Sequence, residues 1–234
     1  MRSIDSIDFR LLDVESDLSG LNYYLDLLEK RIIKNTIDFE RKIIYKLINK
    51  RGLTPDDAEW FLMQNVIEDI GFGVPKMFRY AFIVAMYAVY ESAVHKIAGL
   101  IKKKKGIDIA INDLRGDFLN RGKKYFKDVL HFQFCTDKWA WERINMLSEL
   151  RNSIAHANGR IEMLNKGTRQ KISNWEKQRV GISSIDGFVI TEEVFLRDTL
   201  NLVTASLNEL IERYKEWDDH QRAQAVKTAP PKSN

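Results

Sequence analysis

Cysteine and histidine are scarce in this 234-residue chain, which contains one cysteine, Cys135, and four histidines. A single cysteine excludes an internal disulfide framework and is typical of a reducing compartment. The four histidines are dispersed along the sequence, so they lack the spacing of metal ligands. We therefore expect a cytoplasmic protein that uses neither a metal ion nor another cofactor.

Long hydrophobic runs are also missing. The longest apolar stretch, residues 81–90, is bounded by Arg79 and Glu91. It has about half of the roughly 20 residues that a membrane-spanning helix needs. The N-terminal sequence MRSIDSIDF lacks the apolar region of a signal peptide. We therefore expect no membrane segment, and residues 81–90 are predicted to form part of a buried core helix.

The hydrophobic residues that are present, 44% of the chain, recur mainly at helical spacing. Residues 7–50 form either one long helix or two helices interrupted near Gly20 or Asn35. Residues 71–75, which contain two glycines and a proline, are predicted to form a loop. Further helices are predicted at residues 54–70, 76–103, 114–130 and 139–157, and from Glu193 onward.

The spacing changes only near the end of the chain. Residues 182–190 carry apolar side chains around Asp186-Gly187, which is a strong signal for a β-hairpin. Residues 160–179 are polar and basic without a clear period, and they are predicted to form a mobile loop with one short helix around residues 172–177. The last residues, 223–234, are expected to be disordered.

Side chains that can transfer a proton or bind an anion are concentrated in one segment, residues 149–159, with the sequence ELRNSIAHANG. Apolar residues three or four apart place this segment at the end of an amphipathic helix that Thr136 or Asp137 caps and Asn158-Gly159 terminates. Polar residues form a column beside the apolar stripe. This column contains Asn145, Glu149, Asn152 and His156.

An arginine, an amide and a histidine at a helix end suit the chemistry of a phosphodiester. The guanidinium group offers a planar fork of donors that matches phosphate oxygens, and histidine moves a proton near neutral pH. The sequence from Arg151 and Asn152 to His156 resembles the R-N-x-x-x-H motif of HEPN domains. HEPN domains are all-α modules, and many of them are metal-independent RNases. The hairpin between the motif helix and the last helix is a further similarity to several bacterial HEPN families.

The resemblance covers about residues 76–217 and implies an all-α, HEPN-like helical bundle with one small β-hairpin. We assign residues 1–75 to an N-terminal helical extension that packs on the bundle. Residues 76–220 form the HEPN-like domain, and residues 221–234 form the disordered tail.

The resemblance also implies a reaction. Arg151, Asn152 and His156 would be the catalytic residues of an endoribonuclease in which the ribose 2′-hydroxyl attacks the phosphodiester. One histidine does not easily serve as both base and acid, and HEPN RNases form homodimers in which two motifs make one site. The resemblance is also compatible with a toxin or antiviral defence effector, and it leaves open whether an antitoxin or a defence-system partner exists.

Basic residues are concentrated on both sides of the motif in sequence. Residues 102–127 contain nine basic and three acidic residues, and residues 160–179 contain six and two. Such segments are suited to holding an anionic polymer. We assign RNA binding to Arg160, Lys166, Arg169 and Lys171. Glu149 is a candidate for positioning the catalytic groups. Glu91 is a second candidate, but it lies four residues before His95 and also fits as an ordinary polar contact on the helix surface or at a seam between helices.

Each assignment has a structural alternative. His156 also fits as a cation that interacts with a helix C-terminus, Arg151 as part of a surface ion pair, and Asn152 as an ordinary polar residue. A HEPN-like module that binds RNA, a nucleotide or a partner protein without cleavage is the main alternative function. Some HEPN toxins that pair with nucleotidyltransferase antitoxins carry a tyrosine two residues after the histidine. Asn158 occupies this position here, which disfavours that pairing.

Overall fold

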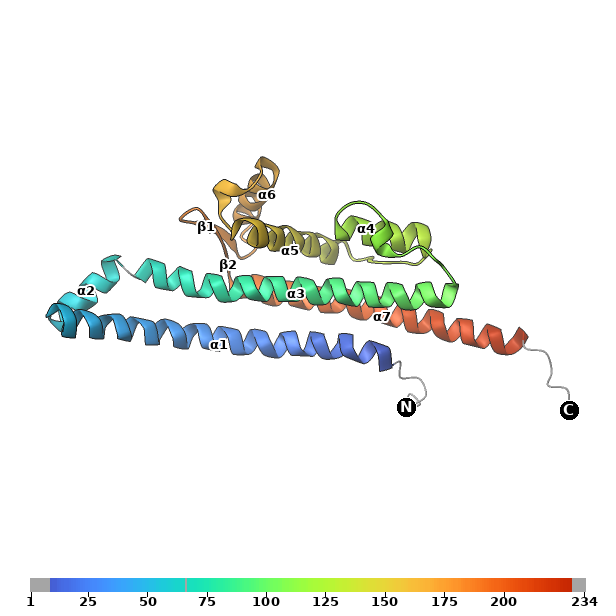
Figure 1. The fold of residues 1–234 in the computed structure, drawn as a ribbon, viewed down its shortest axis with the longest axis horizontal. Coiled ribbons are helices and arrows are strands. Elements are labelled where there is room, and N and C mark those ends of the chain that lie inside the picture. The colour runs from blue at the N-terminus through green and yellow to red at the C-terminus, as the bar shows by residue number, and fades with distance from the viewer. Residues whose placement is uncertain (1–8, 66, 229–234) are drawn as a thin grey trace. The chain divides into compact units, whose positions relative to one another are not determined.

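The fold is all-α with a single small β-hairpin, as the sequence predicts (Figure 1). The computed structural model describes residues 9–65 and 67–228. The α-helices are α1 (Phe9–Arg51), α2 (Pro55–Asn65), α3 (Ile67–Lys105), α4 (Phe118–Lys124), α5 (Lys138–Ala157), α6 (Lys166–Lys177) and α7 (Glu193–Thr228). The antiparallel strands are β1 (Ile182–Ile185) and β2 (Phe188–Thr191). No helix in the described part of the chain is long and apolar enough to cross a membrane.

Two compact units are formed from separate stretches of the chain. The first unit contains Met1–Leu18, Ala88–Asn145 and Asn201–Asn234, and the second contains Ser19–Tyr87 and Met146–Leu200. The predicted domain boundary after residue 75 falls inside α3. Residues 19–75, which the prediction assigns to an extension, therefore belong to the same compact unit as the motif.

Local signals at several helix ends act as the sequence predicts. Helix α1 is one uninterrupted helix and ends at Arg51, where Gly52 has a φ of 68°. The Thr54 hydroxyl oxygen accepts the Asp57 N–H at 3.2 Å at the start of α2. The Asp186-Gly187 pair has φ values of 49° and 77° and forms the two-residue turn of the hairpin.

The prediction of a loop at residues 71–75 is wrong, because helix α3 runs through this segment and contains Pro75. A proline inside a helix removes one backbone hydrogen bond, and glycine weakens helix formation. Residues 73–76 are half-buried, so packing offsets these local preferences. Tertiary context often overrides propensity in this way.

The prediction of a mobile loop at residues 160–179 is also wrong, because most of this segment forms α6. The Asn165 side chain accepts the Thr168 N–H at 2.9 Å and caps the helix. Only Thr168, Ile172 and Trp175 are buried along it. A helix with so few buried positions in a polar sequence has a weak periodic signal, which explains the error.

Two further helices differ in length from the prediction. Helix α4 begins at Phe118, after the Asp117 cap, and continues as a π-helical turn at Tyr125–Val129. Helix α7 continues to Thr228, so the part of the expected tail up to that residue is helical. The remainder of that tail, residues 229–234, lies outside the described residues.

The first unit is held together by aromatic packing and by ion pairs. The Phe126 and Phe134 rings stack with their centroids 4.7 Å apart. Arg213 donates to the Phe134 carbonyl oxygen at 3.0 Å, and Lys104 pairs with the buried Asp218. Helix α7 supplies buried side chains that the sequence predicted, and those in this unit are Val203, Leu207, Leu210 and Ile211. Phe195, Leu196 and Leu200 are also buried as predicted and belong to the second unit.

In the second unit, other parts of the chain bind the edge of β2 that does not pair with β1. Adjacent α3 residues reach two carbonyl oxygens of this strand. Arg79 Nη1 donates to the Thr191 oxygen at 2.9 Å, and the Tyr80 hydroxyl donates to the Val189 oxygen at 2.5 Å. The Val189 N–H donates to the Gly159 oxygen at 2.9 Å. These bonds satisfy edge groups that would otherwise be unpaired.

Arg79 also binds Glu29 of α1. Its Nε donates to Oε1 at 2.9 Å and its Nη2 to Oε2 at 2.8 Å, so the guanidinium fork is bidentate. The two side chains are only 17% and 9% exposed. Leu21, Leu25, Leu28 and Ile32 line the buried face of the same helix, as predicted. Arg79 therefore connects α1, α3 and β2 within this unit.

Gly159→Ala is predicted to destabilise the protein strongly. A Cβ atom at this position would lie 1.9 Å from the Tyr80 hydroxyl, and Gly159 has a φ of 70°. We expect a loss of about 3 kcal/mol in the free energy of unfolding, from backbone strain together with overpacking. Urea denaturation monitored by circular dichroism measures this loss.

Gly187→Ala is the matched control. Gly187 has a φ of 77°, but a Cβ atom added to it would meet no atom of the described residues within 4 Å. Strain alone should therefore cost about 1–2 kcal/mol. Equal losses in the two variants would contradict a role for the contact between Gly159 and Tyr80.

Candidate functional site

Helix α5 carries the motif and is defined at both ends by local hydrogen bonds. The Asp137 carboxylate accepts the N–H groups of Trp139 at 2.7 Å and Ala140 at 3.1 Å, so Asp137 is the cap. At the other end Asn158 and Gly159 adopt φ values of 48° and 70°, and the Gly159 N–H donates to the Ser153 oxygen at 3.1 Å. This bond pattern is a Schellman stop and confirms the predicted helix end.

The two faces of α5 agree with the predicted pattern. Ala140, Ile144, Leu147 and Leu150 are buried, and Ile154 is half-buried. The polar residues of the motif lie on the outer part of the helix, where Asn152 and His156 are exposed. The helix is therefore held by its apolar stripe while Asn152 and His156 face solvent.

Arg151 is half-buried and is held by two neighbours. Its guanidinium carbon lies 5.4 Å from the centroid of the Tyr87 ring, and its Nη1 donates to the Asn152 side-chain oxygen at 2.9 Å. The structure therefore brings Arg151 and Asn152 into contact. The guanidinium group has further N–H donors that neither of these interactions uses.

Tyr87 of α3 contacts the candidate site, although the sequence did not indicate it. It is 4% exposed, and its hydroxyl accepts a hydrogen bond from Ser148 at 3.3 Å. Ser148 and Arg151 lie three residues apart on α5, so both face this tyrosine. The position of Tyr87 in an apolar run predicted a core residue, and nothing in the local sequence distinguished it from its neighbours.

His156 lies in the last turn of α5 and is exposed. Within residues 9–65 and 67–228 its side chain makes no hydrogen bond or ion pair. At 100° per residue, His156 is about 40° around the helix from Asn152 and about 140° from Arg151. One chain therefore does not place the arginine and the histidine side by side on this helix.

Glu149 contacts α6 rather than the catalytic candidates. Its carboxylate accepts hydrogen bonds from Lys171 and, at 3.3 Å, from the Thr168 hydroxyl. The structure places it one turn before Ser153, whose hydroxyl donates to its backbone oxygen at 2.8 Å. Glu149 thus fixes α6 against the helix that carries the motif.

The four residues assigned to RNA binding differ in their surroundings. All four are exposed. Lys171 is paired with Glu149, and Arg160 lies 3.6 Å from Glu162. Lys166 and Arg169 make no ion pair in the part of the chain that the structure describes. These last two residues are therefore the cations most available to an external anion.

Glu91 belongs to the first unit, where it acts on His95. Burial lowers the pKa of His95, the charge of Glu91 opposes this change, and Arg121 lowers the pKa further. The His95 ring also packs 5.1 Å from the Phe118 ring centroid. The role of Glu91 in positioning the motif stays a prediction.

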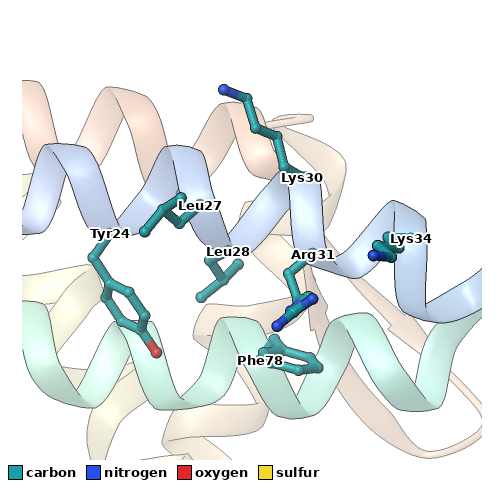
Figure 2. A pocket seen from close by; sticks show the side chains of 7 residues that line it. All are labelled: Tyr24, Leu27, Leu28, Lys30, Arg31, Lys34 and Phe78. Atoms are coloured by element: carbon teal, nitrogen blue, oxygen red, sulfur yellow. The ribbon is translucent and has the colours of Figure 1, made fainter.

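A separate hollow of about 400 Å³ lies between α1 and α3 in the second unit (Figure 2). Figure 2 shows the Arg31 guanidinium directed toward the Phe78 ring and Tyr24 pointing toward α3. The lining residues are Tyr24, Leu27, Leu28, Lys30, Arg31, Lys34 and Phe78. This hollow therefore has an apolar wall and a basic rim, and no residue of the motif lines it.

No cluster of three or more histidine, cysteine or carboxylate side chains suited to a metal ion occurs among the described residues. Comparison with known proteins adds no assignment of its own. No protein-family model, curated protein or solved structure matches the chain. The fold and the exposed end of α5 are therefore the observations on which a function rests.

Proposed function

We propose that this chain is a metal-independent endoribonuclease of the HEPN type that acts as a toxin or phage-defence effector. The observation that carries the proposal is the end of α5, where Arg151 contacts Asn152 and His156 is exposed one turn later. The all-α fold with a hairpin between α5 and α7 supports it, because this arrangement agrees with the family resemblance of the motif.

The proposed reaction is an in-line displacement at phosphorus. A histidine takes the proton of the ribose 2′-hydroxyl, and the resulting oxygen forms a bond to phosphorus while the bond to the 5′-oxygen breaks. A second histidine donates the proton that the 5′-oxygen needs as it leaves. The products are a 2′,3′-cyclic phosphate and a 5′-hydroxyl.

Arg151 stabilises the charge that develops on the two non-bridging oxygens. A guanidinium group donates two parallel hydrogen bonds to such oxygens. The contacts with Tyr87 and Asn152 limit the rotamers of Arg151, so less conformational entropy is lost when it binds the transition state. Asn152 orients Arg151 in the free protein and is one turn away from His156.

A two-fold dimer resolves the requirement for both a base and an acid. Two copies of His156 and two of Arg151 would meet across the symmetry axis. The wide angle between Arg151 and His156 on one helix supports this arrangement, because two motifs supply an arginine and a histidine from opposite sides. The exposure of His156 leaves it accessible to a second copy.

A non-catalytic HEPN-like module is the second candidate. Arg151 favours this candidate because its guanidinium group already contacts the Tyr87 ring and the Asn152 side chain within the chain. In that case Arg151 would stabilise the packing of α5 on α3 instead of a transition state. Binding of RNA by the wild-type protein without any cleavage would favour this candidate.

His156→Ala should abolish RNA cleavage while the fold is retained. Acid–base catalysis by a positioned side chain contributes a factor of about 10² to 10⁴ in rate. Arg151→Ala should have a comparable effect, and Arg151→Lys should not restore activity, because a point charge does not reproduce the guanidinium fork. Asn152→Ala should be milder. Cleavage of total RNA in EDTA measures each rate.

His220→Ala serves as the control, because His220 is an exposed histidine on α7 outside the motif. It should cleave RNA at the wild-type rate. The proposed site is wrong if His156→Ala cleaves as fast as this control, or if the wild type needs a divalent metal.

The purified protein should be a dimer at micromolar concentration. A composite site needs two motifs, so a monomer would lack either the base or the acid. Light scattering coupled to size-exclusion chromatography measures the mass in solution. A monomeric mass for a protein that cleaves RNA would contradict the composite site.

Charge reversal at Lys166 and Arg169 should weaken RNA binding without abolishing cleavage at saturating RNA. Both residues are exposed on α6. Each lost phosphate contact should reduce the dependence of log affinity on log salt by about 0.7 for single strands. Lys171 is unsuitable for this test because its pair with Glu149 holds α6. An unchanged salt slope would show that α6 does not touch the RNA backbone.

A further inference from the structure

Two cations from distant parts of the sequence converge on the ring of Phe188 in the second unit. Lys76 Nζ of α3 lies 3.5 Å from the ring centroid, and the Arg160 guanidinium carbon lies 5.1 Å from it. Phe188 is the first residue of β2 and forms an antiparallel bridge with Arg160. The sum of the two distances is an upper limit on the separation between the cations, and they are close enough for the charge of Arg160 to lower the pKa of Lys76.

The charges of this cluster are poorly balanced. Lys76 is half-buried and makes no ion pair within the described residues. Arg160 pairs only with Glu162 in that part of the chain, at 3.6 Å, and the two side chains are 51% and 76% exposed. Burial lowers the pKa of Lys76, and the charge of Arg160 lowers it further. An anion bound by both cations would offset both unfavourable effects.

The cluster lies directly after the motif in the chain. Arg160 follows the Asn158-Gly159 turn that ends α5, and Gly159 is fixed by its bond to Val189 and by its contact with Tyr80. The backbone that carries Arg160 is therefore held by the same contacts that hold the end of the motif helix. A ligand bound here would have a fixed position relative to that end.

We propose that Lys76 and Arg160 form a phosphate-binding clamp on Phe188 that holds one phosphodiester of the RNA strand beside the end of α5. This proposal rests on the proposed RNase function for the identity of its ligand. The two cations interact with the Phe188 ring, which makes phosphate a better ligand than a stacked base. Contacts of this kind fix the register of a strand without reading its sequence.

The clamp is tested with a fluorescein-labelled single-stranded DNA of about 12 nucleotides, a length that fits typical single-strand sites. DNA has the same phosphates as RNA but no 2′-hydroxyl, so binding is measured without cleavage. Fluorescence anisotropy at several salt concentrations gives the affinity and its salt slope for wild type, Lys76→Met and Arg160→Gln.

Each substitution should weaken binding about tenfold at low salt and reduce the salt slope by about 0.7. The Lys76→Arg variant keeps the charge and should bind like the wild type. Lys138→Met is the control with the same loss of charge. Lys138 is 85% exposed at the first position of α5, about 27 Å along the helix from His156 at the usual rise per residue.

The outcomes separate the clamp from the catalytic proposal. Loss of DNA binding in both clamp variants but not in Lys138→Met supports the clamp, even if the wild type never cleaves RNA. Binding by Lys76→Met and Arg160→Gln equal to that of Lys138→Met overturns the clamp, even if RNA is cleaved at His156. Failure of the wild type to bind the DNA at low salt overturns it as well.

Discussion

The second unit depends on the hydrogen bonds that the guanidinium group of Arg79 makes. From α3, this group donates to the Glu29 carboxylate of α1 and to the Thr191 carbonyl oxygen of β2. Ion pairs of this kind gain little overall, because burying two charges is costly, but losing one partner leaves the other charged and buried. Arg79 therefore acts mainly by fixing which faces of these elements meet. The next residue, Tyr80, places the end of the motif helix against the same strand.

The motif depends on this framework although it contains none of its residues. Gly159 packs against the Tyr80 ring, which leaves no room for a side chain, and its carbonyl oxygen binds β2. Burial raises the pKa of Tyr80, so its hydroxyl remains a neutral donor near neutral pH. Before the motif in the sequence, Glu149 holds α6 through Lys171 and Thr168. The exposed residues of the motif are thus carried on a helix whose surroundings are fixed by buried contacts.

Local chemistry accounts for what the sequence predicted correctly. The Asp186-Gly187 turn, the cap at Asp137 and the stop at Asn158-Gly159 each depend on a few neighbouring residues. The features that were missed depend on distant partners. Packing keeps α3 helical through Pro75, and Tyr87 contacts the candidate site only because α5 lies against it. The motif residues were proposed from their spacing and from the family resemblance, and their role stays a prediction, while their contacts needed the fold.

The hairpin has a consequence for how this protein meets other molecules. Its β2 edge is occupied by Arg79, Tyr80 and Gly159, and on β1 the Ser184 N–H donates to Glu176 of α6 at 3.0 Å. A peptide that binds by adding a strand needs free backbone donors and acceptors along an edge. The groups named here are already used within the chain. Strand addition at these positions is therefore blocked, and an inhibitor built as an extended peptide would find no template there.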